Sequence, residues 1–525
     1  MKKKTVSFIL ALALTLAMTA CSSKNSQDEQ GIFLEEGQNS NEAKSTGIEI
    51  EGASYIELSD EDILLNGENI TANTKEAVYA ANDIVYYEEG KDFTYGEGTE
   101  ADAHSKKEAD MHTVVHITKP GTYILTGKLS AGQIAVDLGE EAKDDPEAVV
   151  TLVLNGVDIT STVAPGVIFY NVYECCSDDK EEALKDVDTS AAGANIIIAD
   201  GSVNNVAGSY VAKIYKSVEL NEDGTEVVDS KKLHKYDGAF YSKMSMNING
   251  EEENSGVLNI LAENEGLGSE LHLTINGGQI NIVSGNDGIN TNEDKVSVTT
   301  VNGGFLNIRV DGSTGEGDGI DSNGWLVING GVVNTSACAT SMDAGIDSDM
   351  GIHINGGTVV AAGNMLDHIS ESEQSYVVFT FQDKVRGGEE LALVKEEESH
   401  FWAMPNDFTF LIVSKASFGE EGSYTLWKGE EQLSVIEMND NMGGPGMMRP
   451  DGEMEPGERP EMPEGMEPGE RPEMPEGFEE GNVPGGGRGG KGGFEQMNLE
   501  DAVAEFEIKA GGNMFMVVSD KTEMQ

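Results

Sequence analysis

The sequence is poor in basic residues, in cysteine and in long apolar runs, and each shortage excludes a class of protein. Its 525 residues contain 34 Lys and Arg against 94 Asp and Glu, a formal charge of −60. A field of that sign repels nucleic acid and anionic lipid surfaces, so neither is an expected partner. The four cysteines match neither a disulfide framework nor a zinc site. After residue 21 no apolar run approaches the roughly 20 residues that span a bilayer.

The first 21 residues have the pattern of an export signal. Three lysines precede an apolar run from Val6 to Ala17, which Met18-Thr19-Ala20-Cys21 follows. This segment resembles a bacterial lipoprotein signal, in which Cys21 is lipidated and becomes the first residue. We therefore expect a signal peptide at 1–20, a flexible tether at 21–47 and an extracytoplasmic protein, anchored to the membrane by lipid and exposed at the surface. Met18 replaces the usual Leu of that pattern, so a secreted, unlipidated product is the alternative.

Glycine, in contrast, is abundant and punctuates a repeat. Asn-Gly-Gly recurs with its Asn at positions 276, 302, 329 and 355, so the steps are 26, 27 and 26 residues. Alternating apolar residues between these motifs, such as Leu271, Leu273 and Ile275, predict short strands joined by tight turns. Such units bury their apolar face only by stacking on one another. The pattern therefore predicts an all-β parallel β-helix, a solenoid, over residues 48–368, with its clearest coils at 237–363.

The segments around the clear coils have other patterns. Early strand-like segments are interpreted as diverged coils with charged insertions at 176–192 and 218–235, and a separate N-terminal sandwich domain is the alternative. Residues 369–438 contain strands without the repeat and are expected to form a β-rich cap over the end of the solenoid. Residues 439–496, rich in Pro, Glu, Gly and Met, predict a disordered segment. Residues 497–525 are strand-like again and are expected to return to the cap.

Acidic and amide residues recur at the turns of the clear coils. In a stacked fold Asp287 would lie below Asp318, and Asn290 would lie below Asp321 and Asp347. Carboxylates about 5 Å apart repel by a few kcal/mol per pair at an intermediate dielectric. From residue 237 to residue 368 there are eighteen acidic residues but only three Lys or Arg, so ion pairs within this part of the chain do not neutralise the columns.

Calcium would offset this repulsion. It takes about six to eight oxygen ligands from carboxylates, amides and backbone carbonyls, which these turns supply. The sequence therefore predicts one or more Ca²⁺ ions between the coils, and the candidate ligands are Asp287, Asn290, Asp318, Asp321, Asp343 and Asp347. The alternative is that Asp-Gly serves only as turn chemistry, with hydrated carboxylates.

Several motifs carry a resemblance, namely the NGG triplets, NDGIN, GDGIDSNG, DAGIDSD, VTLVLNGVDI and NIIIADGSVN. The region from Met111 to Gly363 resembles the bacterial carbohydrate-binding-domain family of calcium-binding parallel β-helix proteins, of the clostridial cellulose- and pectin-binding type. The resemblance implies a right-handed helix, calcium between coils, a place outside the cell, and binding of cellulose or a polygalacturonate-like polysaccharide. The family's acidic turns correspond here to Asp287, Asp318, Asp321 and Asp347. Ala344 stands where the family would have Asp.

Three functions remain open on the sequence. A polysaccharide lyase acting on uronate polymers needs a Lys or Arg base beside calcium, and Lys295 is the nearest cation to the acidic turns. Aromatic rings for stacking on sugars are few, although Trp325 follows an acidic turn. We therefore expect a calcium-dependent carbohydrate-binding protein that does not cleave its ligand, with Trp325 and Lys295 as candidate ligand contacts. The lyase and a calcium-stiffened surface adhesin or scaffold are the alternatives.

Overall fold

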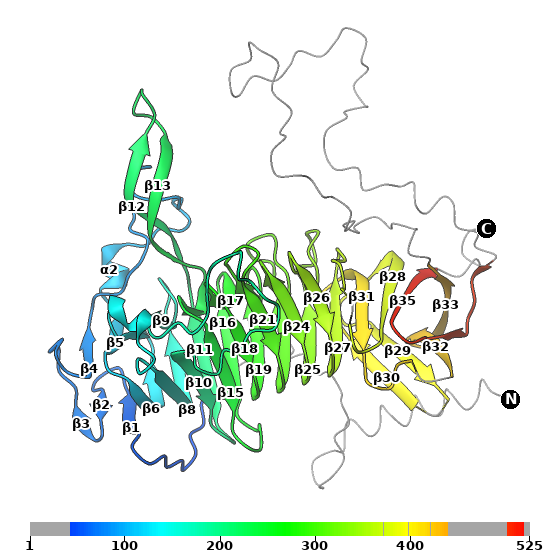
Figure 1. Cartoon of the computed structure of the whole chain (residues 1–525), viewed down its shortest axis with the longest axis horizontal. Helices are drawn as coiled ribbons and strands as arrows, with labels where there is room; N and C mark the ends of the chain where they lie inside the picture. The colour runs from blue at the N-terminus through cyan, green and yellow to red at the C-terminus, as the bar shows by residue number, and fades with distance from the viewer. Residues whose placement is uncertain (1–41, 371, 397, 420–421, 439–500, 519–525) are drawn as a thin grey trace.

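The computed structural model of the chain describes residues 42–370, 372–396, 398–419, 422–438 and 501–518. These residues form an all-β protein whose strands follow one another along its long axis (Figure 1). The expected signal peptide, Cys21, most of the tether and the segment 439–496 lie outside the described residues. Within the described part, no helix is both long and apolar enough to cross a membrane.

Most strands pair in parallel with a strand from the preceding and the following repeat, and they form three columns. The first column consists of β1 (Ser54–Leu58), β6 (Gly121–Leu129), β8 (Val150–Thr160), β10 (Ala194–Ile198), β15 (Met246–Gly250), β18 (Leu273–Ile275), β21 (Val298–Val301), β24 (Trp325–Ile328) and β26 (Gly351–Ile354). The second column continues from the end of β8 through β11 (Val203–Gly208), β16 (Val257–Ala262), β19 (Gln279–Ser284), β22 (Phe305–Val310), β25 (Val332–Ser336) and β27 (Thr358–Gly363).

The third column is a separate 8-stranded sheet. It consists of β4 (Val78–Ala81), β5 (Thr113–Ile117), β7 (Gly132–Asp137), β9 (Val167–Asn171), β14 (Gly238–Ser242), β17 (Glu265–Ser269), β20 (Ile289–Thr291) and β23 (Ile320–Ser322), all parallel except β4. The early strands therefore belong to the same sheets as the strands of the clear repeats. Shorter elements near this end are β2 (Leu64–Leu65), β3 (Glu68–Asn69), the helix α2 (Lys106–Ala109) and the 3-10 turn η1 (Glu140–Asp144).

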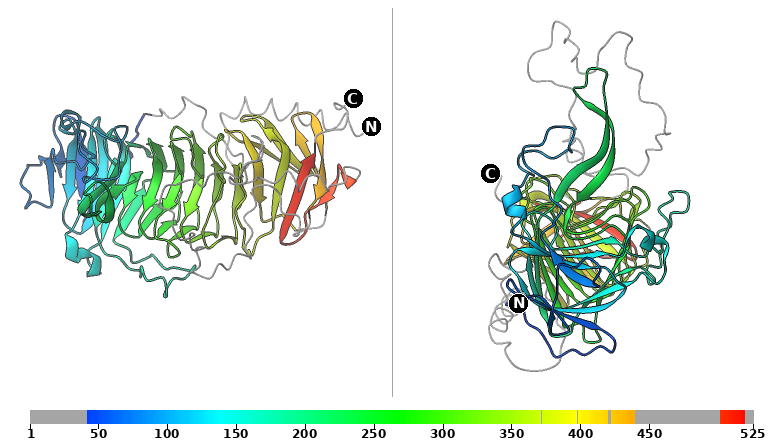
Figure 2. Two further views of the ribbon diagram at one scale, coloured as in Figure 1. Left: turned by 90° about the horizontal axis from the view of Figure 1, so that it is seen from above. Right: turned by 90° about the vertical axis from the view of Figure 1, so that its left-hand side faces the viewer.

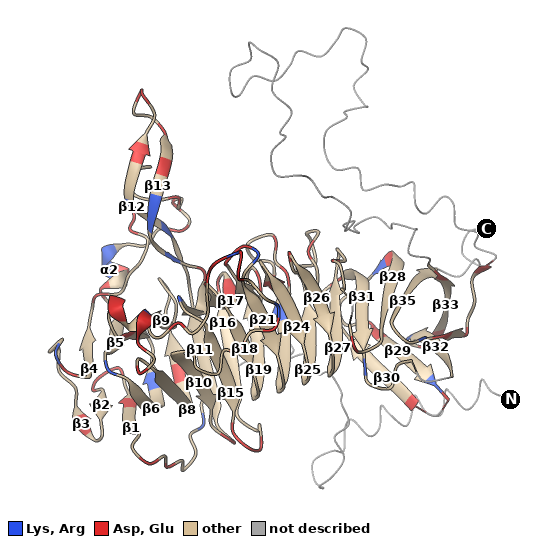
Figure 3. Ribbon diagram, in the orientation of Figure 1, with Lys and Arg blue, Asp and Glu red and all other residues tan. Residues whose placement is uncertain are grey.

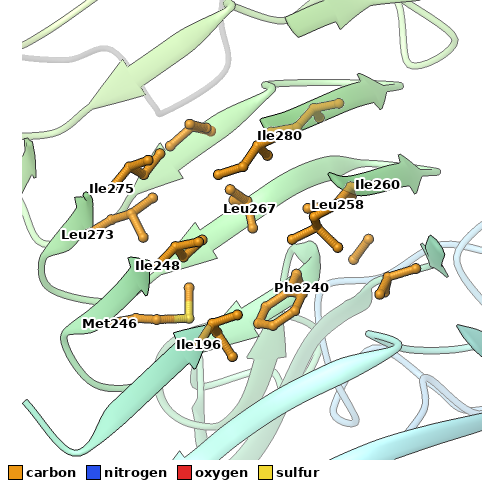
Figure 4. Close-up of a cluster of buried hydrophobic side chains, with 14 of the residues drawn as sticks. Ile196, Phe240, Met246, Ile248, Leu258, Ile260, Leu267, Leu273, Ile275 and Ile280 are labelled. Carbon is orange, nitrogen blue, oxygen red and sulfur yellow. The ribbon is translucent and has the colours of Figure 1, made fainter. Parts of the chain in front are cut away.

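The core lies between the three columns. In the first column Ile248 pairs with Ile275, which pairs with Val301, and the next partners are again apolar. Figure 4 shows side chains from all three columns converging, for example Ile275 from the first, Leu258 from the second and Leu267 from the third. We use the word coil for one repeat of the stack. Each pairing places an apolar side chain next to another apolar side chain in the following coil, so the alternating apolar residues of the sequence form continuous rows inside the stack.

Two rows of asparagines run along the stack, one mostly exposed or half-buried and one mostly buried. The NGG ladder links the side-chain amides of successive coils, each Nδ2 donating to the Oδ1 of the coil before at 2.9 Å, and its members are Asn249, Asn276, Asn302, Asn329 and Asn355. The mid-strand ladder does the same in the second column at 2.9–3.0 Å, and its members are Asn205, Asn259, Asn281, Asn307 and Asn334. An amide both donates and accepts, so identical residues can bond to one another when they are stacked.

The glycines of each NGG triplet allow the coils to approach. The second glycine has positive φ, +84° at Gly304 and +76° at Gly331, a conformation that other residues rarely adopt. A Cβ placed on Gly331 would lie 2.8 Å from the carbonyl oxygen of Gly304 and from the carbonyl carbon of Gly303. Each triplet therefore provides one asparagine of the NGG ladder, which we call a rung, and two glycines at which the backbones of successive coils pack directly on each other.

The far end of the stack is covered by strands that mostly run antiparallel. These are β28 (Tyr376–Val385), β29 (Glu390–Lys395), β30 (Glu398–Ala403), β31 (Phe408–Ser414), β32 (Ser423–Lys428), β33 (Glu431–Glu437), β34 (Phe506–Glu507) and β35 (Gly512–Val518). β31 pairs antiparallel with β27, the last strand of the second column, and β35 lies between β28 and β33. They enclose an apolar cluster of their own, which includes Phe379, Phe408 and Phe515.

One hairpin departs from the stack. β12 (Val211–Leu220) and β13 (Val227–Tyr236) pair antiparallel and project away from the body near its N-terminal end (Figures 1 and 2). The segment 218–235, expected as a charged surface insertion, forms most of this hairpin. Its last residues, next to β14, approach the third column.

We predict that Gly331→Ala destabilises the protein by about 2 kcal/mol or more, because the new Cβ meets backbone and positive φ is strained for alanine. The matched control is Gly47→Ala, where no atom lies within 4 Å of the added Cβ and φ is ordinary. Chemical denaturation followed by circular dichroism measures both. Equal stabilities for the two variants would contradict this account of the NGG triplet.

Candidate functional site

The entries to the third-column strands gather acidic and amide side chains. Figure 3 shows acidic residues at many turns of the stack. We use the name acidic corner for the group formed by Glu265, Asp287, Asn290, Asp318, Asp321 and Asp347. Glu265 begins β17, the next two coils add Asp287 and Asn290 at β20 and Asp318 and Asp321 at β23, and the coil after them adds Asp347 alone.

The first row of the acidic corner contains Glu265, Asp287 and Asp318. The backbone carbonyl of Asp287 accepts from Gly266 N–H, and that of Asp318 accepts from Gly288 N–H, both at 3.0 Å, which places these residues in consecutive coils. The next position is Ala344, whose carbonyl accepts from Gly319 at 3.0 Å. Ala344 has no carboxylate, so this row of acidic side chains ends at Asp318.

The second row contains Asn290, Asp321 and Asp347. Asn290 pairs with Asp321 in the parallel register of β20 and β23. The N–H of Asp347 donates to the carbonyl of Ile320 at 2.7 Å, so Asp347 continues the row in the next coil. Asp343, also a sequence candidate, lies outside both rows. Its carboxylate accepts from Gly317 N–H at 2.6 Å and from the Ser341 hydroxyl.

Backbone groups of the next coil donate to the first-row carboxylates. Asp287 Oδ1 accepts from Asp318 N–H at 2.7 Å, and Asp318 Oδ1 accepts from Ala344 N–H at 2.5 Å. Each of these bonds links one coil to the next through a side chain. They favour the charged form of the acceptor.

Burial nevertheless disfavours the charge on these carboxyl groups. Burial, followed by the charge of Asp287, raises the pKa of Asp318 to about 10. Burial also raises the pKa of Asp321 to about 7, with a smaller contribution from Asp287, and that of Asp347 to about 7, with a smaller contribution from Asp367. Without a cation, the acidic corner therefore holds protons at neutral pH that free aspartates would release.

Two buried oxygens in the acidic corner have no hydrogen-bond partner among the described residues. They are Asn290 Oδ1 and Glu265 Oε2. The Asn290 amide group donates to Glu265 Oε1 at 2.9 Å and lies 3.5 Å from Asp287 Oδ2, so its own oxygen faces away from those carboxylates. The ligand atoms that this part of the structure offers are all oxygens, the type that a hard divalent cation such as Ca²⁺ prefers.

Two charged groups near the acidic corner, Lys235 and Asp367, were not singled out from the sequence. Lys235, at the base of the hairpin, has its Nζ 2.8 Å from Asp237 Oδ2, one coil before Glu265. Asp367 accepts from Ser348 N–H at 3.1 Å and raises the pKa of Asp347. Asp237 and Glu265 each precede a glycine, as the acidic residues of the repeated turns do, so the sequence pattern includes them. Lys235 and Asp367 belong to no repeated motif.

The two candidate ligand contacts lie at a neighbouring turn. Trp325 begins β24, is partly exposed and pairs with Val298 and Gly351. Lys295 is exposed, has φ +62° and donates its backbone N–H to the carbonyl of Asn323. Neither belongs to the acidic corner.

A second group of possible metal ligands lies elsewhere. Among the described residues, one set of three His, Cys, Asp or Glu side chains has its ligand atoms within 4.8 Å of one another, and it consists of Glu174, Cys175 and Cys176. The Glu174 carboxylate already accepts from Ser245 N–H at 2.6 Å and Cys176 N–H at 3.0 Å. The acidic corner contains no such set of three among the described residues, because its carboxylates are spread along the coils. An ion bound there would need amide or backbone oxygens as additional ligands.

Comparisons with known proteins place the chain in a family. No curated protein matches it. A solved structure, described as the polysaccharide lyase-like protein from C. thermocellum in a gadolinium derivative, is 19% identical with a TM-score of 0.31, over 61% of this chain and 92% of that one. The family described as carbohydrate-binding domain-containing protein matches residues 111–380, which is more than half of the 525 residues. The chain therefore belongs to the carbohydrate-binding domain-containing protein family.

Proposed function

We propose that the protein binds polysaccharide outside the cell without cleaving it, and that calcium is needed for the bound form. The observation that carries the proposal is the family match over residues 111–380, which spans the three columns from β5 to β27 and reaches β28. Binding is thus assigned to the stacked strands rather than to the cap. Cellulose and polygalacturonate-like chains are the polysaccharide classes to test.

We infer that the stacked strands form a right-handed parallel β-helix. Parallel pairing in three columns, with steps of 26 or 27 residues between partners such as Ile275, Val301 and Ile328, supports one turn of chain per repeat. The right hand follows the general preference of crossovers between parallel strands. A coiled stack of this kind presents long, flat faces suited to extended polymers.

We infer that Ca²⁺ binds in the acidic corner. Asp287, Asp318, Asp321 and Asp347 would supply carboxylate oxygens, and Asn290 would supply the amide oxygen that is otherwise unpaired. The ion would neutralise like charges that burial makes costly. The protein's own residues hold the coils in register, so that these oxygens stay on adjacent turns.

The contacts of Lys235 and Arg309 support binding rather than lyase chemistry. Burial of Lys235 opposes its charge, but the charge of Asp237 and their hydrogen bond outweigh this and raise the pKa of Lys235. A lysine with a raised pKa stays protonated and is a poor base. Arg309, the arginine of the clear coils, directs its Nε toward Asn406 Oδ1 at 3.3 Å.

We predict that calcium reverses the effect of Asp321→Asn on stability. In EDTA the variant should melt at or above the temperature of the wild type, because one buried like charge is gone. In calcium it should melt below the wild type, because a ligand is lost, and saturation at about 100 times Kd stabilises the wild type by about 2.7 kcal/mol. Differential scanning calorimetry with and without calcium measures both.

The control for this prediction is Asp311→Asn, at an exposed turn outside the acidic corner. It should follow the wild type in both buffers. Identical melting temperatures of the wild type in EDTA and in calcium, with no calcium bound in equilibrium dialysis, would sink the metal assignment.

We predict that the full chain is retained on a polysaccharide matrix without degrading it. Affinity electrophoresis through cellulose derivatives and polygalacturonate measures retention, and absorbance of unsaturated products measures cleavage. Retention with constant absorbance in calcium is the expected result. Rising absorbance would establish a lyase, and calcium-dependent stability without retention on any polysaccharide would favour the adhesin or scaffold.

We propose that the protein is exported and anchored through lipid on Cys21, which lies outside the described residues. The lysine-rich start, apolar run and small-residue cleavage site support this. Cys21→Ala should move the protein from the membrane fraction to the medium or the soluble extracytoplasmic fraction. Unchanged fractionation of the variant would contradict lipidation.

A further inference from the structure

The outer face that carries the NGG ladder is hollowed into a groove of about 580 Å³. We call it the amide groove. Its floor is made by Asn249, Asn276, Asn302 and Asn329, with Thr274 and Thr300 beside them. The threonines precede Asn276 and Asn302 by two residues, and alternate residues of a strand point to one face, so the two rows run side by side along the stack.

One wall of the amide groove is the segment 185–190, part of the insertion between β9 and β10. Thr189 fixes it to the floor, because its hydroxyl lies 2.7 Å from both Asn247 Oδ1 and Thr274 Oγ1, and its carbonyl accepts from Asn247 Nδ2 at 2.7 Å. The connection between β9 and β10 is seen from above running along the stack in the left view of Figure 2. Asn276, Asn302 and Asn329 remain exposed next to this wall.

The floor offers paired donors and acceptors in a regular row. A side-chain amide has two N–H donors and two acceptor lone pairs. The Asn276 amide donates one N–H to Asn249 and accepts one hydrogen bond from Asn302. Asn302 likewise donates to Asn276 and accepts from Asn329. Each rung therefore keeps one donor and one acceptor position for a ligand, which matches hydroxyl groups that both donate and accept.

The charges around the amide groove favour an uncharged ligand. Lys185 Nζ lies 2.8 Å from Asp186 Oδ2, so its charge is already paired. Asp188 is the remaining charged residue of the lining, and hydrogen bonds from Ser190 lower its pKa, so it is a carboxylate at neutral pH. A polymer of uronates would meet this charge and the protein's overall charge of −60 without a compensating cation.

We propose that the amide groove binds a neutral, extended glycan whose hydroxyls bond to successive rungs of the NGG ladder. This rests on the proposed polysaccharide binding and names its place and ligand class. The lining extends from Asn195 through four coil steps to Val327, about 19 Å at the usual strand spacing, which is long enough for about four sugar units. Calcium in the acidic corner would then serve the stack, while the amide groove holds the sugar.

Isothermal titration of the full chain in calcium tests this with neutral β-1,4-linked hexasaccharides of glucose, mannose and xylose, and with hexagalacturonate. Asn276→Ala removes an exposed rung of the amide groove. Asn281→Ala is the matched control, since Asn281 lies in the same coil, in the middle of the mid-strand ladder, and also bonds to an asparagine on either side. We expect a neutral hexasaccharide to bind about tenfold more weakly to Asn276→Ala and within about twofold of wild type to Asn281→Ala.

Several results would overturn the proposal that the amide groove binds a neutral glycan. Equal affinities of the two variants for the neutral hexasaccharides would place the sugar elsewhere. Binding of hexagalacturonate alone would reverse the ligand class. Absence of hexasaccharide binding while the chain is still retained on a polysaccharide matrix would reject the groove but leave the proposed function standing. Absence of both would reject the two together. Circular dichroism melting of both variants shows that each ladder loses a comparable contact.

Discussion

Parallel hydrogen bonding between a strand and its equivalent one coil away is the constraint on which the rest of the structure depends. It stacks equivalent residues at about 4.8 Å, whatever their chemistry. Ile248, Ile275 and Val301 gain from this because apolar neighbours exclude water together. Asparagines gain because amides bond to amides, as in the rows through Asn276 and Asn281. Stacked aspartates are destabilising, because the stacking brings like charges close together.

The acidic corner is where this constraint acts against stability. Asp287 and Asp318 are held in consecutive coils by the same backbone bonds that align the apolar rows, so they cannot move apart without breaking the stack. The backbone N–H groups that donate to them relieve part of the repulsion, while burial keeps the pKa of Asp318 near 10. Groups held in unfavourable protonation states often mark functional sites, because a ligand can then repay the cost.

The repeat made much of the architecture and part of the site predictable. Steps of 26 or 27 residues in the NGG motif predicted the all-β class, and they predicted that Asn290 would pair with Asp321. Non-periodic contacts were not predictable in the same way. Thr189 reaches Asn247 and Thr274 only because an insertion packs against the first column. Such contacts depend on the three-dimensional path of segments that have no counterpart in other coils.

The strand pairing at the two ends of the stack differs from the pairing in its interior. β4 is antiparallel to β5 at one end and β31 is antiparallel to β27 at the other, whereas the interior strands pair in parallel with strands of the preceding and following repeats. Duplication or loss of one whole interior unit would consequently leave both closures intact. Gene-level changes of a single repeat therefore offer a direct evolutionary route to longer or shorter rods, in which the reach of the outer face is adjusted in increments of one turn.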